Sequence, residues 1–282
     1  MIRMSEVVLP GHPDRFCDQV ADAIVGAAYA VDPRAYCQVE MSVWCDQVFL
    51  TGGIVTRTAL REPLPDIVRR VGRDIAHYID NGFDTSRYVV HDTVCQDVGE
   101  PRTWTDKVND QCITVGWAGY DAKTCWLGPE HYLAQVLGKA IAQGGRWGRL
   151  HRQGPDGKLL VRVREDGDAW NLEHVLITMQ QRADTPFLTF VEDVARCIRE
   201  AYEEVRAHDR RWVTPAGGVE LLVNPNGPLI NGGSEGDNGQ TGRKLAVDYY
   251  GPRVAIGGGA LAGKDFSHID RAAAYGAREA AV

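Results

Sequence analysis

The sequence lacks the features that mark several large classes of protein. Its seven cysteines form an odd set without a Cys-x-x-Cys pair, and this spacing suits neither a zinc site nor the disulfide framework of a secreted domain. No apolar run approaches the roughly 20 residues of a membrane span. The N-terminus has no apolar stretch typical of a signal peptide. We therefore expect reduced thiols in a cytoplasmic chain without a membrane partner.

Basic residues are too few for a general nucleic-acid surface. Lys and Arg total 31 against 38 Asp and Glu, which gives a formal net charge of −7. Because such a surface needs a basic face, nucleic acid is not an expected partner. An acidic chain can still bind a polyanion where its cations are concentrated, as they are at residues 243–264.

The hydrophobic pattern predicts an α+β fold. Helices are expected where apolar residues recur at helical spacing, over 13–29, 64–78, 131–142 and 187–207 and from Asp270. Strands are expected where apolar and polar residues alternate, over 36–44, 47–56, 88–91, 159–164, 171–179, 219–224 and 245–250. Residues 97–110 are polar and irregular, a candidate mobile loop. Helices that follow paired strands recur along the chain, which indicates repeated sheet-and-helix units.

Residues 231–278 carry the most chemical information. Two glycine-rich turns, Gly-Asp-Asn-Gly-Gln-Thr-Gly-Arg-Lys and Gly-Gly-Gly-Ala-Leu-Ala-Gly-Lys-Asp, both contain cations near their ends. Glycine lets backbone N–H groups approach an anion closely, and Arg and Lys add positive charge. Nearby carboxylates suit magnesium. Either turn alone would be an ordinary loop with solvated charges, but together they predict a site for a polyphosphate and its metal.

These two blocks closely resemble the signature of the S-adenosylmethionine synthetase (methionine adenosyltransferase) family. A third block, Gly11-His12-Pro13-Asp14-Arg15, is similar to the family's Gly-His-Pro-Asp-Lys motif, and weaker similarities fall at 109–111, 154–158 and 224–225. The resemblance covers the whole chain and identifies it as a divergent member that is short at its C-terminal end.

The resemblance implies a fold and an activity. The family has three repeated sheet-and-helix domains, which we expect here at 1–108, 109–225 and 226–282, the third incomplete. The implied enzyme joins ATP to the sulfur of methionine or a related acceptor and releases phosphate and pyrophosphate. Because the family's active site lies between two subunits, we expect a homodimer or a hetero-oligomer with a completing subunit.

The resemblance also assigns roles to single residues. His12 is expected beside the triphosphate, at the oxygen that bridges to the ribose, as a hydrogen-bond donor. Catalysis is assigned to His12, Lys158, Arg243 and Lys264, and phosphate binding to the same four residues together with Asp156, Asp237, Lys244 and His268. Magnesium is assigned to Asp14 and Asp270, potassium to Glu40, and Glu6 is a candidate for the metal neighbourhood.

Acceptor binding is assigned to Gln96, Asp110, Asp237 and Ile54. The first three match the family pattern, whereas Ile54 and two positions near the nucleotide depart from it. Ile54 stands where the family has a glutamate that handles the methionine ammonium, Leu229 replaces a phenylalanine that stacks on adenine, and His268 replaces a lysine. Phosphate and metal positions are mostly kept. This pattern predicts that the tripolyphosphate chemistry is retained, while the acceptor molecule, or the way in which it binds, has changed. Asp110 is the nearest substitute for the missing glutamate.

Other interpretations stay open. Glu40 could be a solvated strand residue, and Lys158 follows Pro-Asp-Gly, a turn that surface hairpins use freely. One rival function is a non-catalytic or half-catalytic subunit of a hetero-oligomeric synthetase, because a sheet without its last strands leaves an edge and an apolar face to be covered. Another is a hydrolase of tripolyphosphate or ATP.

Overall fold

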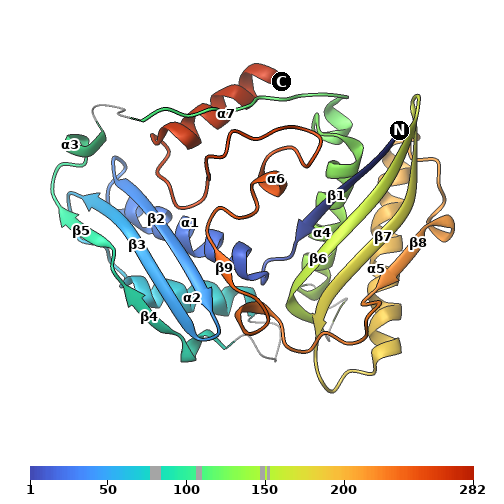
Figure 1. Ribbon diagram of the computed structural model, residues 1–282, viewed down its shortest axis with the longest axis horizontal. Helices are drawn as coiled ribbons and strands as arrows, with labels where there is room; N and C mark the ends of the chain where they lie inside the picture. Colours follow the sequence, from blue (N-terminus) through green and yellow to red (C-terminus); the bar gives the residue numbers. More distant parts are fainter. Residues whose placement is uncertain (77–83, 106–109, 147–149, 151–152) are drawn as a thin grey trace.

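The chain folds into two sheet-and-helix layers with the C-terminal segment running between them (Figure 1). The computed structural model describes residues 1–76, 84–105, 110–146, 150 and 153–282. Sheets and helices alternate along the chain, which confirms the predicted α+β class. Within the described residues, no helix has both the length and the apolar character needed to span a membrane.

The first layer is a sheet covered on one face by two helices. Its strands run in the order β4-β3-β2-β9, with β5 also paired to β3. The elements are β2 (Tyr36–Trp44), β3 (Gln47–Thr56), β4 (Val89–Asp92), β5 (Cys95–Val98), β9 (Gly239–Gln240), α1 (Pro13–Val31) and α2 (Leu64–Ala76). Cys37, Val39 and Met41 of β2 are buried in the core with residues of both helices. Successive strand residues face opposite sides, so Glu40 lies on the face away from the helices.

The second layer contains the longest strands. Its order is β1-β6-β7-β8, with β1 (Ile2–Val8), β6 (Gln153–Asp166), β7 (Ala169–Gln181), β8 (Glu220–Val223), α4 (Pro129–Arg146) and α5 (Phe187–His208). Its core includes Leu133 and Leu137 of α4 and the large aromatic side chains Trp170, Tyr202 and Trp212. β1 pairs antiparallel with β6, so the first strand completes this sheet before α1 crosses to the other layer. The domain boundaries at 108 and 225 stay a prediction.

The segment after residue 225 adds no separate sheet within the described part of the chain. Its β9 pairs with β2 of the first layer, and its helices are α6 (Leu245–Asp248) and α7 (Ile269–Ala281). The strand predicted at 245–250 is therefore wrong. A short apolar run fits either period, and here Val247 is buried against the second layer while its carbonyl accepts a hydrogen bond from Gln135 at 3.0 Å.

The segment predicted as an irregular loop at 97–110 is partly ordered. β5 ends at Val98 and a single helical turn, α3, covers Arg102–Thr105. Residues 106–109, and with them the weak similarity at Asn109, lie outside the described residues. Whether the loop is mobile therefore stays a prediction.

Candidate active site

Three carboxylates on one face of α1 hold the C-terminal segment in place. They stand four residues apart, a spacing that places side chains on the same face of a helix. Each accepts a hydrogen bond from a backbone N–H, at 2.9, 2.9 and 3.1 Å, in the pairs Asp14 with Gln240, Asp18 with Gly242 and Asp22 with Gly263. At Gly263 a side chain would not fit, because its φ is +78° and an added Cβ would lie 2.1 Å from the carbonyl oxygen of Val39. These contacts bring both glycine-rich turns beside α1.

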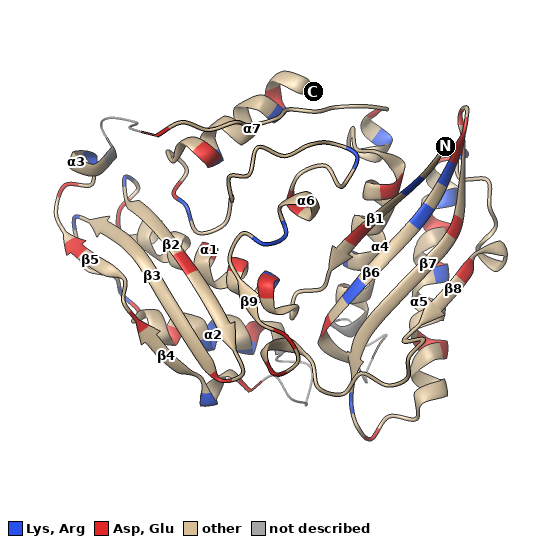
Figure 2. Cartoon of the chain, in the orientation of Figure 1, with Lys and Arg blue, Asp and Glu red and all other residues tan. Residues whose placement is uncertain are grey.

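Asp14 contacts two of the predicted phosphate-binding cations. Its carboxylate is buried, with 1% of the residue exposed, and it forms an ion pair with Lys244. Arg243 lies 3.5 Å from the other carboxylate oxygen. In Figure 2 basic residues of the C-terminal segment lie beside acidic residues of α1. The Gly-His-Pro-Asp motif and the first glycine-rich turn therefore meet in space.

His12 is the N-cap of α1, and its ring is held in one tautomer. Its Nδ1 accepts the backbone N–H of Asp14 at 3.2 Å, so the ring proton is on Nε2. Burial and the charge of Lys244 lower the pKa of His12 to about 4, and Lys158 also lowers it, while Asp14 and Asp237 oppose the shift. At neutral pH His12 is thus uncharged, with a proton on Nε2 that it can donate to a hydrogen bond; its role in the reaction stays a prediction.

Asp156 and Lys158 reach the same place from β6. Asp156 accepts the backbone N–H of Gly233 at 2.8 Å, and burial raises the pKa of its carboxyl. Lys158 is half exposed and lies 3.9 Å from Glu6 of β1. Together these residues form the His12 group, whose members are His12, Asp14, Asp156, Lys158, Asp237, Arg243 and Lys244. A cavity of about 370 Å³ adjoins it, lined in part by Glu6, Arg243 and Lys244.

A second set of predicted residues lies at the start of α7. Lys264 forms an ion pair of 2.6 Å with Asp270, and His268 is the N-cap of α7, where its Nδ1 accepts the backbone N–H of Asp270 at 3.2 Å. Asp110 is exposed, and the segment that follows it runs along α7, where Cys112 contacts the carbonyl of Ile269 at 3.8 Å. We call Asp110, Lys264, His268 and Asp270 the Lys264 group.

The remaining predicted residues lie on the first sheet, beside the Lys264 group. An antiparallel backbone β-bridge between Gln38 and Lys264 joins that group to β2. Glu40 is exposed on the outer face and lines a cavity of about 360 Å³. Gln96 of β5 is exposed and pairs in register with Ile54 of β3.

Ile54 lies in the core of the first layer. Only 1% of it is exposed, and it packs among the buried residues under α1 and α2. Part of it also borders the cavity that Glu40 lines. An apolar side chain is therefore well suited to this position, and its role in acceptor binding stays a prediction.

The two groups form separate sets of contacts in the described part of the chain. No hydrogen bond or ion pair between described residues joins the His12 group to the Lys264 group. Within the same part of the chain, no cluster of three or more His, Cys, Asp or Glu residues is arranged to hold a metal ion. In each group one carboxylate instead pairs with a lysine, Asp14 with Lys244 and Asp270 with Lys264. This suits magnesium, which commonly binds through one or two carboxylates together with substrate phosphates.

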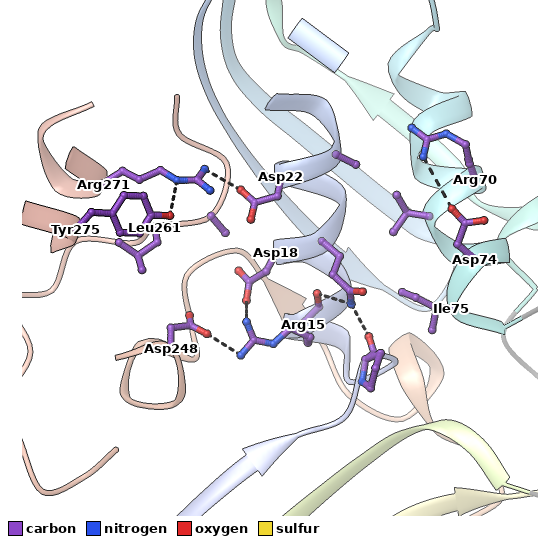
Figure 3. Close-up of a pocket in the computed structure, with 15 residues that line it drawn as sticks. Arg15, Asp18, Asp22, Arg70, Asp74, Ile75, Asp248, Leu261, Arg271 and Tyr275 are labelled. Carbon is purple, nitrogen blue, oxygen red and sulfur yellow. Dashed lines mark hydrogen bonds and ion pairs between the residues drawn. The ribbon is translucent and has the colours of Figure 1, made fainter. Parts of the chain in front are cut away.

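A larger cavity lies elsewhere, and none of the predicted site residues lines it (Figure 3). Its volume is about 950 Å³, and it is bounded by α1, α2 and the C-terminal segment. Its charged residues are paired: Arg15 contacts Asp248 at 2.7 Å and Asp18 at 3.3 Å, and Arg271 contacts Asp22 at 3.1 Å. This network joins the C-terminal segment to α1. The sequence analysis missed it, although the four-residue spacing of the acids along α1 was a visible signal.

Comparison with known proteins places this arrangement in a family. Residues 1–98 match the model of the S-adenosylmethionine synthetase N-terminal domain, and residues 231–282 match that of the C-terminal domain. The chain is 36% identical over 286 residues to S-adenosylmethionine synthase 1 of Rhodospirillum rubrum, with 98% of this chain and 72% of that protein covered. It is 35% identical over 295 residues to the S-adenosylmethionine synthase of Nocardia farcinica, with 97% and 72% covered. The chain therefore belongs to the S-adenosylmethionine synthetase family, an enzyme family of methionine adenosyltransferases.

Proposed function

We propose that the chain forms S-adenosylmethionine from ATP and methionine and releases phosphate and pyrophosphate. The observation that carries this proposal is the His12 group, in which an uncharged imidazole donor and the cations Arg243 and Lys244 lie beside a buried carboxylate, and Lys158 acts on the same imidazole. Such a group suits a leaving group that carries several negative charges. The names of the relatives support the same reaction.

The chemistry follows from where charge develops. The methionine sulfur attacks the 5′ carbon of ATP, a carbon–sulfur bond forms, and the carbon–oxygen bond to the triphosphate breaks with its electron pair on oxygen. His12 Nε2–H donates to that oxygen. Lys158, Arg243 and Lys244 neutralise the charge that the departing tripolyphosphate gains. Water then cleaves the tripolyphosphate to phosphate and pyrophosphate.

Asp14 and Lys244 exchange partners in this proposal. In the free chain each neutralises the other. When ATP enters, Lys244 turns to a phosphate and the Asp14 carboxylate becomes available as a metal ligand. Asp14 and Asp270 would hold magnesium and Glu40 potassium; magnesium, when bound, supplies further neutralisation of phosphate charge.

A complete site then requires two chains. We propose a homodimer in which the His12 group of one chain faces the Lys264 group of the other, in line with the family resemblance. Each chain carries both groups, so two identical subunits suffice and a specialised half-catalytic partner is not needed. Because Ile54 is buried, we assign the ammonium of methionine to Asp110, which is exposed.

One experiment tests the proposal directly. The purified chain is incubated with ATP, magnesium, potassium and methionine, every adenosyl product is identified by mass, and the oligomeric state is measured by light scattering. We expect S-adenosylmethionine with equal amounts of phosphate and pyrophosphate, from a dimer or a larger oligomer. Phosphate release without an adenosyl product would instead make the chain a hydrolase, and activity only after a second protein is added would restore the half-catalytic reading.

A further inference from the structure

Two acids of α1 hold equivalent positions in the two glycine-rich turns. Asp18 accepts the backbone N–H of Gly242 at 2.9 Å. Asp22 accepts the backbone N–H of Gly263 at 3.1 Å. The two glycines have nearly the same backbone angle, with φ of +79° and +78°, in the region that favours glycine. In both turns the next residue is a predicted phosphate-binding cation, so α1 holds the main chain just before a cation twice.

In the second turn an arginine also holds the main chain after the cation. The guanidinium of Arg271, on α7, donates to the carbonyl of Lys264 at 2.7 Å. The same nitrogen donates to the carboxylate of Asp22 at 3.1 Å (Figure 3). Because Asp22 also accepts the N–H of Gly263, the ion pair of Asp22 and Arg271 holds the main chain on both sides of Lys264.

The guanidinium of Arg271 is itself fixed in place. Its Nε donates to the hydroxyl of Tyr275 at 3.0 Å (Figure 3), and its central carbon lies 4.6 Å from the ring centre of Phe266. Phe266 is tied to α1, because its N–H donates to the hydroxyl of Tyr29 at 3.1 Å. Only 9% of Arg271 is exposed. A planar guanidinium with these contacts holds one orientation.

These main-chain contacts do not depend on the partner of the Lys264 ammonium. In the free chain the ammonium pairs with Asp270 at 2.6 Å, whereas Arg271 and Asp22 bind the carbonyl of Lys264 and the N–H before it. When a phosphate replaces Asp270 as the partner of the ammonium, the main-chain contacts can stay. Charges that are already in position stabilise a developing anion without the cost of reorganisation.

We propose that Asp22 and Arg271 are positioning residues for Lys264. Their ion pair fixes the backbone of the second glycine-rich turn, so that the ammonium keeps its place when it leaves Asp270 for the polyphosphate. This rests on the proposed function for the role of Lys264. The competing explanation is that the pair only docks α7 on α1 and adds to stability.

The test is a double-mutant cycle on the affinity of the full chain for tripolyphosphate with magnesium, measured by calorimetry. Lys264→Ala alone should weaken binding roughly tenfold to a hundredfold, through the loss of a bond between charged groups. Arg271→Lys keeps the charge but loses the planar fork, and should weaken binding roughly threefold to thirtyfold. In the chain that already carries Lys264→Ala, Arg271→Lys should change the affinity by less than about twofold, because no ammonium is left to position.

Asp22→Asn gives a test by sign. It keeps an acceptor for the Gly263 N–H and removes the charge that holds Arg271. Loss of a negative charge near a bound polyanion should by itself strengthen binding, whereas a lost positioning contact should weaken it, here by roughly threefold to tenfold. This variant takes the place of Arg271→Lys in the cycle if that chain does not fold.

Arg57→Lys is the matched control. Arg57 binds Asp32, just past the end of α1, through two nitrogens at 2.9 and 2.6 Å. Its replacement weakens an arginine–aspartate pair of the same kind away from the second glycine-rich turn. It should lower the melting temperature and leave the tripolyphosphate affinity unchanged.

Three results overturn the proposal. They are losses that multiply independently in the cycle, parental binding by Arg271→Lys, and tighter binding by Asp22→Asn. Parental binding by Lys264→Ala also overturns it, because the cation to be positioned then has no role. The outcome stands apart from the proposed function. A parent chain that makes no S-adenosylmethionine yet shows the coupling fails the proposed function and keeps the positioning role, and a parent that makes the product with independent losses does the reverse.

Discussion

Lys244 forms an ion pair with the buried carboxylate of Asp14, although 229 residues separate them in the chain. A buried carboxylate is costly unless it is paired and hydrogen-bonded, and Asp14 also accepts the backbone N–H of Gln240. The pair fixes the first glycine-rich turn against the start of α1. The predicted catalytic histidine and two of the predicted phosphate-binding cations, Arg243 and Lys244, therefore reach one place before any substrate binds.

Charge neutralisation by the glycine-rich turns gives the first prediction. Arg243→Ala and Lys264→Ala each remove one preorganised cation from a developing polyanion, so each should lower phosphate release from ATP by roughly a hundredfold or more. Steady-state turnover with saturating methionine measures this. Lys139→Ala, an exposed lysine on α4, is the control and should act like the parent. If both turn variants keep parental turnover, the phosphate assignment is wrong.

Metal dependence is the second prediction. Activity should vanish in a chelator and return with added magnesium, because one carboxylate in each group is suited to bind metal together with phosphate. Asp14→Asn should raise the magnesium concentration needed for half-maximal activity, since an amide is a weaker ligand than a carboxylate. A titration of rate against magnesium tests both statements, with Asp74→Asn, at an exposed side chain of α2, as the matched control. Full activity in chelator would remove the metal interpretation.

The third prediction concerns Asp18 and the pH dependence of stability. Burial raises the pKa of its carboxyl from the usual 3.8 to about 6, against the lowering effects of Gly242 and Arg15. The folded state therefore holds the proton more tightly than the unfolded state. The contribution of Asp18 to stability is highest below about pH 4 and falls as the pH rises to about 6, by an amount on the order of 2–3 kcal/mol.

Asp18→Asn isolates this effect from other titrating groups. Asparagine keeps an acceptor for the Gly242 N–H and does not titrate. The free energy of unfolding in urea, measured from pH 4 to pH 7, should shift in favour of the variant as the pH rises. A difference between variant and parent that is constant across this range would contradict the assignment.

The sequence pattern predicted local elements well and long-range contacts poorly. The hairpin of β2 and β3 was predicted with its observed bounds, because strict alternation and a two-residue turn are local signals. The strand predicted at 245–250 failed because the burial of Val247 depends on a distant helix. The pairing of β1 with β6 and the docking of the glycine-rich turns on α1 join residues from opposite parts of the chain, which periodicity does not report.

The family resemblance named the site residues but could not show how Ile54 packs. From the sequence, Ile54 stands where an ammonium ligand is expected and missing; in the fold it is a core residue.

The burial of Ile54 gives the fourth prediction. Ile54→Glu should lower the free energy of unfolding by roughly 2–5 kcal/mol, because it buries a carboxyl without a partner, and should not improve methionine use. Ile54→Val, which keeps the shape of the core, should cost about 0.5–1.5 kcal/mol. Tighter methionine binding by a stable Ile54→Glu chain would show that position 54 faces the acceptor.

The last prediction tests Asp110 as the ligand of the methionine ammonium. Asp110 is exposed, it accepts only the neighbouring N–H of Gln111 at 2.7 Å among the described contacts, and the chain after it follows α7, which carries Asp270 and His268. Asp110→Asn removes the charge and keeps the shape, so it should raise the KM for methionine roughly tenfold to a hundredfold through the loss of a charge-assisted hydrogen bond. The KM for ATP should change little. Asp121→Asn, in a neighbouring exposed turn that pairs with Arg211, is the control for a general effect of the substitution. An unchanged methionine KM in Asp110→Asn would exclude this carboxylate and turn the search for the ammonium ligand to Asp237.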